Sequence, residues 1–228
     1  MAALTKCRFG LSGNALKIIA AVTMTIDHIG HLFFPGQTVW RIIGRIAMPI
    51  YAFMVAEGCC HTRNKLRYFL MMLGLGLLCQ PIYPTFARGW SMAIPVNYAI
   101  SILLFILLER AVKDRNLSWA ALFILSLIPA YQITETLKID YGFWGCMLPI
   151  FCVFPRMLGR KERYLQVLAL GLGLVILCQD SSQVQWWSLL ALPLLLLYRG
   201  ERGKLPMKYF FYVFYPLHLL ILMAITVL

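Results

Sequence analysis

Two residues near the beginning of the chain have types and a spacing that suit acyl-transfer chemistry. Lys17 and His28 are 11 residues apart. On an α-helix this spacing places them on one face, roughly 16 Å apart along the axis. A lysine ammonium binds phosphate, and a neutral imidazole can accept a proton from an attacking group. The pair therefore fits a long cofactor whose anionic head lies at Lys17 and whose reactive thioester reaches His28.

Further ionisable residues lie within apolar segments, where a charge costs at least about 2.5–3.5 kcal/mol on insertion scales. They are Asp27, His31, Arg41, Arg45, Glu57, His61 and His218. Asp27 and His31 are spaced i and i+4, so Asp27 could orient His31 on a helix. Asp27 could instead pair with Arg41 or Arg45. These two arginines also share a helical face and could clamp a carboxylate or stabilise an oxyanion.

Structural interpretations of the same residues remain open. His28 and His31 could be hydrogen-bond partners between helices, and the two arginines could extend to the membrane surface. Glu57 and His61 could form a surface salt bridge with Arg63. The proline two residues before His218 should kink its helix, and packing around this kink could by itself explain the residues found there. No metal ion is expected, because the acidic and histidine residues show no closed ligand spacing.

The composition is that of an integral membrane protein. Of the 228 residues, 61% are hydrophobic and 13% are charged, whereas soluble domains are about 45–50% apolar and about 25% charged. The net charge of +12 comes from short basic clusters between apolar runs. This pattern is typical of a lipid-facing chain and excludes nucleic acid as the expected partner. The seven cysteines have no zinc or redox spacing and are interpreted as small apolar residues within helices.

The apolar runs predict an all-α, polytopic transmembrane helix bundle that forms a single domain over residues 1–228. The first run contains Asp27 and His28 and lacks a small-residue cleavage site, so we expect it to be a span and not a signal peptide. Of the 21 lysines and arginines, 17 fall in alternate loops, which predicts a cytoplasmic N-terminus. About nine spans are expected, at residues 14–34, 42–60, 66–83, 96–110, 117–133, 142–156, 164–179, 186–198 and 208–227.

Several motifs, in order along almost the whole chain, resemble those of the TraX family of F-pilin acetylation proteins. They are Leu11-Ser-Gly-Asn-Ala-Leu-Lys17, Ile26-Asp-His-Ile-Gly30, Arg41-Ile-Ile-Gly-Arg-Ile-Ala-Met-Pro49, Glu57-Gly58 followed by His61-Thr-Arg-Asn64, Asp140-Tyr-Gly142, Leu197-Tyr-Arg-Gly-Glu-Arg-Gly203 and Phe210-Phe-Tyr-Val-Phe-Tyr-Pro-Leu-His218. Residues 80–97 match only loosely, and this region could help to choose the acceptor.

The resemblance implies acetyl transfer from cytoplasmic acetyl-CoA to the N-terminal amine of a pilin subunit, in the bacterial inner membrane. The spacing of Lys17 and His28 is also similar to a motif of membrane acyltransferases that acetylate sugars. In that group the basic residue contacts the CoA and the histidine is catalytic. These roles fall on Lys17 and His28, while the acceptor, a pilin or a cell-surface group, stays open.

The working hypothesis is a transmembrane acetyltransferase with His28 as general base. A covalent acetyl-histidine is a variant of it. Arg45, helped by Asn97 or His218, is expected to stabilise the oxyanion. The full set of expected catalytic residues is His28, Asp27, Arg45 and His218. The residues expected to hold CoA are Lys17, Arg63 and Lys65, and those expected to bind the acceptor are Arg41, His31, Asn97 and Asp140.

Two other functions are compatible with the sequence. A small transporter or channel could use the buried aspartate, histidines and arginine as a proton or anion path. A non-catalytic pilus assembly factor would need none of the histidines.

Overall fold

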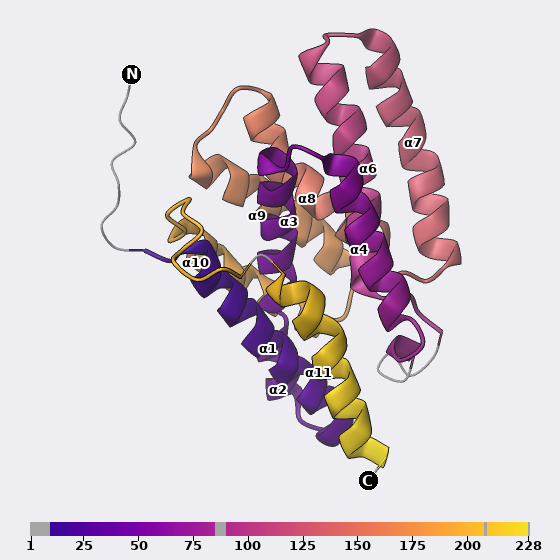
Figure 1. Ribbon diagram of the computed structural model, residues 1–228, viewed down its shortest axis with the longest axis vertical. Coiled ribbons are helices and arrows are strands. Elements are labelled where there is room, and N and C mark those ends of the chain that lie inside the picture. Colours follow the sequence, from indigo (N-terminus) through magenta and orange to yellow (C-terminus); the bar gives the residue numbers. More distant parts are fainter. Residues whose placement is uncertain (1–9, 85–89, 208, 228) are drawn as a thin grey trace.

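The computed structural model describes residues 10–84, 90–207 and 209–227, and within these ranges the regular structure is helical apart from two isolated β-bridges (Figure 1). Four of the basic residues used to orient the chain lie outside the described residues, namely Lys6, Arg8, Arg88 and Lys208. The orientation of the bundle in a membrane therefore stays a prediction.

Helices correspond to all nine expected spans. The elements are α1 (Gly13–Phe33), α2 (Thr38–Gly44), α3 (Ala47–His61), α4 (Lys65–Cys79), α6 (Ile94–Lys113), α7 (Leu117–Thr136), α8 (Gly142–Met157), α9 (Arg163–Gln179), the 3₁₀ helix η1 (Gln183–Leu190), α10 (Ala191–Leu196) and α11 (Phe210–Val227). The second expected span is divided into α2 and α3, and the eighth is formed by η1 and α10.

Four of these helical segments are long and apolar enough to cross a membrane: α1, the α2–α3 pair taken together, α6 and α7. Four shorter apolar segments follow in the second half of the chain, at 142–157, 163–179, 183–196 and 210–226. The helical bundle is thus as predicted, while the number of helices that cross the bilayer stays a prediction.

The beginning of α1 is fastened to the segment that precedes α11. The N–H groups of Leu11, Gly13 and Asn14 donate to the carbonyls of Leu197, Glu201 and Arg202, at 2.7–2.8 Å. The hydroxyl of Ser12 accepts from the Ala15 N–H and caps the helix. These bonds satisfy donors that a helix start leaves open, and α11 lies beside α1, as Figure 1 shows.

Small residues allow α1 and α2 to approach closely. A Cβ atom on Gly44 would overlap the side chain of Asp27, and one on Gly30 would overlap Trp40. The close approach at Gly44 brings the α2–α3 break against the second half of α1.

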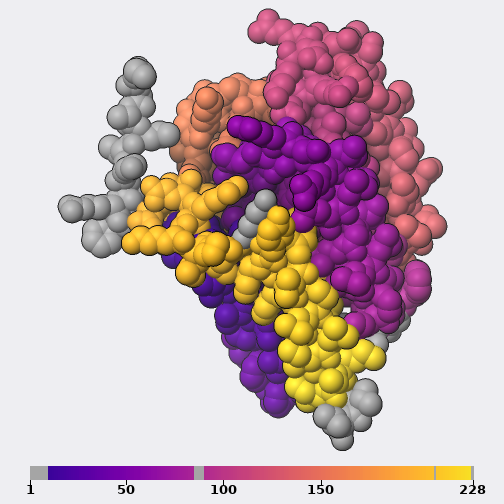
Figure 2. Space-filling model, in the orientation of Figure 1, coloured from indigo at the N-terminus to yellow at the C-terminus, as the bar shows by residue number. Residues whose placement is uncertain are grey.

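Helix α3 is the centre of the bundle, because it packs against α1, α6, α8, α9 and α10. Helix α11 covers the junction of α1 and α4 (Figure 2). Helix α7 packs on α6 and α8 and leaves large apolar side chains exposed, including Ile124, Leu125 and Ile128, each about 60% accessible. Such an apolar exposed face is expected where a helix faces lipid.

Candidate active site

Many of the polar residues predicted from the sequence converge on one cavity of about 280 Å³. The second half of α1, the α2–α3 break, the region before α6 and the segment between α7 and α8 form its walls. Six of the predicted site residues line it: Asp27, His28, His31, Arg41, Arg45 and Asp140. Charged side chains and imidazole rings therefore line one cavity at one end of the bundle.

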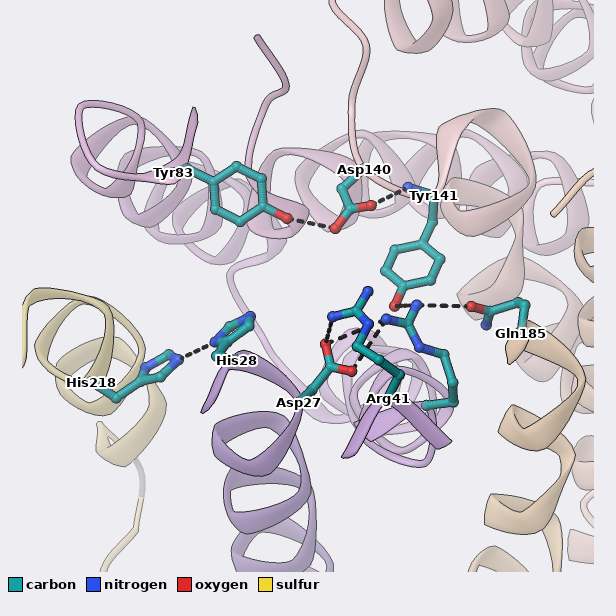
Figure 3. Close-up of polar contacts among 9 residues, drawn as sticks. Asp27, His28, Arg41, Tyr83, Asp140, Tyr141, Gln185 and His218 are labelled. Atoms are coloured by element: carbon teal, nitrogen blue, oxygen red, sulfur yellow. Dashed lines mark hydrogen bonds and ion pairs between the residues drawn. The ribbon is translucent and has the colours of Figure 1, made fainter. Parts of the chain in front are cut away.

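Asp27 accepts hydrogen bonds from both neighbouring arginines (Figure 3). Arg41 Nη1 lies 2.7 Å from Asp27 Oδ2, and Arg45 Nη2 lies 3.2 Å from Asp27 Oδ1. Asp27 and Arg45 are 13% and 11% exposed, whereas the Arg41 side chain is 33% exposed. The carboxylate that the two arginines clamp is thus supplied by the chain itself. A buried carboxylate between two guanidinium groups is electrostatically compensated.

The guanidinium of Arg45 has two further acceptors. Its Nη1 donates to Tyr141 Oη at 3.0 Å and to Gln185 Oε1 at 3.1 Å. With Asp27, these partners come from α1, η1 and the residue before α8. Arg45 is therefore held from three sides and joins these elements at the cavity wall.

His28 and His218 form a hydrogen-bonded pair between α1 and α11 (Figure 3). His28 Nδ1 lies 2.9 Å from His218 Nε2, and the two ring planes differ by 7°. His218 Nδ1 lies 2.9 Å from the Phe214 carbonyl oxygen. Because a carbonyl only accepts, His218 Nδ1 carries the hydrogen. In the neutral pair, His218 Nε2 then accepts from His28 Nδ1–H, and the basic lone pair of His28 is on Nε2.

Lys17 contacts the beginning of α11. Its Nζ donates to the Met207 carbonyl at 3.4 Å and lies 5.7 Å from the centroid of the Phe211 ring. Lys17 and His28 thus both face α11, as their 11-residue spacing predicts. Stacked rings of Phe210, Phe214 and His218, with centroids 5.0–5.2 Å apart, continue along α11 toward His28.

Asp140 is fixed on the wall opposite the histidine pair (Figure 3). Its carboxylate accepts from Tyr83 Oη and from the Tyr141 N–H. Its backbone N–H donates to the Met92 carbonyl at 3.0 Å. Burial raises the pKa of the Asp140 carboxyl above its usual value, although the hydrogen bond from Tyr83 acts in the opposite direction.

Asn97 does not line the cavity. Its side-chain nitrogen donates to the carbonyls of Asp140 and Gly142, at 2.8 and 2.9 Å. Asn97 therefore supports the segment that carries Asp140 and does not face the space where a substrate would bind.

Two residues expected to hold CoA lie at the opposite end of α3. Arg63 is exposed. Lys65 forms an ion pair of 3.0 Å with Glu109 and lies 5.8 Å from the Phe105 ring centroid. Nearby, Glu57 pairs with Arg156 at 3.0 Å, and His61 lies 3.8 Å from the same carboxylate.

Sequence reasoning missed four residues around the cavity: Tyr51, Tyr83, Tyr141 and Gln185. No ligand spacing or charge marks them, and they come from four separate segments. Among the described residues, no group of three His, Cys, Asp or Glu side chains is arranged to hold a metal ion.

The chain is 27% identical, over 92% of its length and 94% of the relative's, to a protein of Dichelobacter nodosus named "Probable fimbrial assembly protein FimC, serogroup H1". A stretch of 40 residues is 58% identical to "Uncharacterized protein RP591" of Rickettsia prowazekii (strain Madrid E). This stretch is 18% of this chain and 16% of the Rickettsia protein. No solved structure matches. The family model described as "TraX protein" matches residues 12–226, so the chain belongs to the TraX family.

Proposed function

We propose that this protein is a membrane-embedded acetyltransferase that moves an acetyl group from acetyl-CoA to an acceptor in the cavity. One observation supports this most directly. His28 lines a polar cavity, is hydrogen-bonded to His218 of α11, and lies on the same side of α1 as Lys17. A base and a phosphate-binding cation are thereby joined along one pair of helices.

His28 acts as the general base. The Phe214 carbonyl fixes the tautomer of His218, and His218 in turn fixes that of His28, so that Nε2 of His28 receives the proton. When His28 becomes protonated, the positive charge is shared by a hydrogen bond to His218. This orienting function replaces the one that a carboxylate serves in other base–orienter pairs.

Lys17 holds the anionic part of acetyl-CoA. In the structure its ammonium contacts a carbonyl and an aromatic ring, both weaker partners than phosphate. The ion pair of Lys65 with Glu109 favours Lys17 over Lys65 for this function.

Asp140 and Arg41 position the acceptor. They lie on the cavity wall, and Arg41 is the more exposed of the two arginines that hold Asp27. The name of the Dichelobacter nodosus relative supports an acceptor connected with a pilus, such as the terminal amine of a pilin subunit. We place the protein in the bacterial inner membrane, where cytoplasmic acetyl-CoA reaches the Lys17 end.

The test uses purified full-length protein in lipid nanodiscs with radiolabelled acetyl-CoA and candidate acceptors. We expect release of CoA and a labelled acceptor, and a loss of at least about 100-fold for His28→Ala. His61→Ala is the matched control, because this exposed histidine lies at the other end of α3. Undiminished transfer by folded His28→Ala would exclude the proposal.

A non-catalytic role in pilus assembly is the second candidate, favoured by the name of the same relative. It requires that replacing all four histidines together leaves pilus assembly intact, whereas the enzymatic proposal requires that assembly or pilin acetylation be lost.

A further inference from the structure

Resting on the proposed function, this inference concerns the group that stabilises the oxyanion. When an acceptor attacks a thioester, negative charge develops on the carbonyl oxygen, and a donor aimed at that oxygen lowers the barrier. Arg45 was expected to serve as this donor. Its Nη atoms instead donate to Asp27, Tyr141 and Gln185. Both Nη atoms are thus engaged, and of the Arg45 nitrogens only Nε has no partner among the described residues. The cavity holds a second unpartnered donor, on α3.

Tyr51 has the required properties. It lies on α3, one turn after the residues Ala47 and Met48, and all three line the cavity together with His28. Its hydroxyl is buried and has no hydrogen-bond partner among the described residues. A buried hydroxyl without a partner costs free energy that folding alone does not recover. Such a group at a cavity wall points to a ligand atom that accepts its hydrogen.

The position of Tyr51 also matches the path that acetyl-CoA would take from Lys17 to His28. Its ring packs edge-on against Phe211, with centroids 5.0 Å apart and an interplanar angle of 77°. The Phe211 ring in turn lies beside the ammonium of Lys17. Tyr51 thus connects the Lys17 end of the site with the cavity that contains His28.

We infer that the Tyr51 hydroxyl donates a hydrogen bond to the thioester carbonyl oxygen and stabilises the oxyanion. The acceptor's amine or hydroxyl forms a bond to the carbonyl carbon, and its proton passes to His28 Nε2. The electron pair of the C=O bond moves to the oxygen that Tyr51 contacts. As this pair re-forms the C=O bond, the carbon–sulfur bond breaks, and the CoA thiolate takes the proton back from His28.

The chain offers a matched control in Tyr215. Its hydroxyl is also buried without a hydrogen-bond partner among the described residues. Tyr215 belongs to α11, is 7% exposed, and is not among the residues that line the cavity. Removing either hydroxyl therefore has the same structural consequence, while only Tyr51 can reach the reacting carbonyl.

The experiment compares Tyr51→Phe, Tyr215→Phe and the unaltered protein, each purified at full length in nanodiscs. We expect Tyr51→Phe to lower kcat by about 10²–10³-fold. KM for acetyl-CoA should change by less than about threefold, because this hydrogen bond is much stronger to the oxyanion than to the neutral carbonyl of the bound thioester. Both variants should keep their melting temperature or gain slightly. Tyr215→Phe should keep its kcat.

The results separate this inference from the proposed function. Turnover by the unaltered protein, its loss in His28→Ala, and a kcat for Tyr51→Phe within about threefold of normal would overturn the Tyr51 inference alone. An equal loss of kcat in Tyr215→Phe would also overturn it. Absence of any turnover by the unaltered, folded protein would overturn both.

Discussion

His28 and His218 are 190 residues apart in the chain, yet their ring nitrogens lie 2.9 Å apart. The bond joins the second half of α1 to the middle of α11, and the Phe214 carbonyl determines its direction. A carbonyl one helical turn away therefore decides which nitrogen of a histidine on another helix is basic.

Replacing His218 tests this relay. His218→Phe removes the acceptor while keeping a ring between Phe214 and His28, so His28 can adopt either tautomer. We expect kcat to fall by about 10–100-fold with little change in KM for acetyl-CoA. His218→Gln, whose side-chain oxygen can accept from His28 Nδ1–H, should restore part of the rate. Equal rates in the two variants would contradict the relay.

Removing the carboxylate of Asp27 should destabilise the bundle strongly. Asp27→Ala removes the carboxylate with which both guanidinium groups form ion pairs. Breaking a fully buried pair costs about 3–5 kcal/mol, which is the upper bound for this largely buried one. We expect a large drop in melting temperature in detergent. The double variant Asp27→Ala/Arg45→Met removes the more buried of the two arginines as well and should recover part of the loss. Additive losses would show that these residues are not coupled.

The close approach of α2 to α1 can be tested at Gly44. A methyl group there overlaps Asp27, so Gly44→Ala should displace the clamp and lower both stability and activity. The control is Gly74→Ala in α4, where a Cβ meets no atom within 4 Å. Alanine is favoured over glycine in a helix by about 1 kcal/mol, so this control should be neutral or stabilising in a thermal melt.

The two lysines should differ in their effect on acetyl-CoA binding. Lys17→Met removes the proposed phosphate contact, so we expect KM for acetyl-CoA to rise at least about tenfold and to depend less on salt. Lys65→Met removes a residue already paired with Glu109 and should alter KM by less than about threefold. Steady-state kinetics at two ionic strengths measures both effects. The reverse ranking would assign the phosphates to Lys65.

Asp140 should give the stability a recognisable pH dependence. Burial raises the pKa of this carboxyl, so the folded protein binds a proton there more readily than the unfolded chain. The contribution of this group to stability is therefore present at acidic pH and is lost as pH rises through the folded pKa. Asp140→Asn lacks this dependence. Its melting temperature relative to the unaltered protein should rise between about pH 4 and pH 7.

Helical spacing predicted the features that depend on one continuous helix. Lys17 and His28 share a side of α1, and Arg41 and Arg45 converge on one partner, because each pair is separated by nearly whole turns. The apolar runs predicted the helices themselves, since hydrophobicity over about 20 residues is a strong signal.

The partners of these residues could not be predicted in the same way. The α2–α3 break interrupts the register between Arg45 and Tyr51, so no spacing rule relates Tyr51 to the arginines. Tyr83 lies beyond the end of α4, Tyr141 directly before α8, and Gln185 in a 3₁₀ helix. None of these positions belongs to a long helix whose face a periodic pattern reveals. Lys65 was assigned to CoA by its charge, and only packing places Glu109 beside it.

The fastening of α1 to the segment before α11 has a consequence for biosynthesis. The backbone N–H groups of residues 11–14 bond to carbonyls at 197–202, and His28 bonds to His218. These contacts form only after α11 has been synthesised and has packed against α1. A nascent chain interrupted before residue 218 contains the base without its orienting ring. Under the proposed function, such an incomplete chain would therefore cleave thioesters more slowly than the full-length protein.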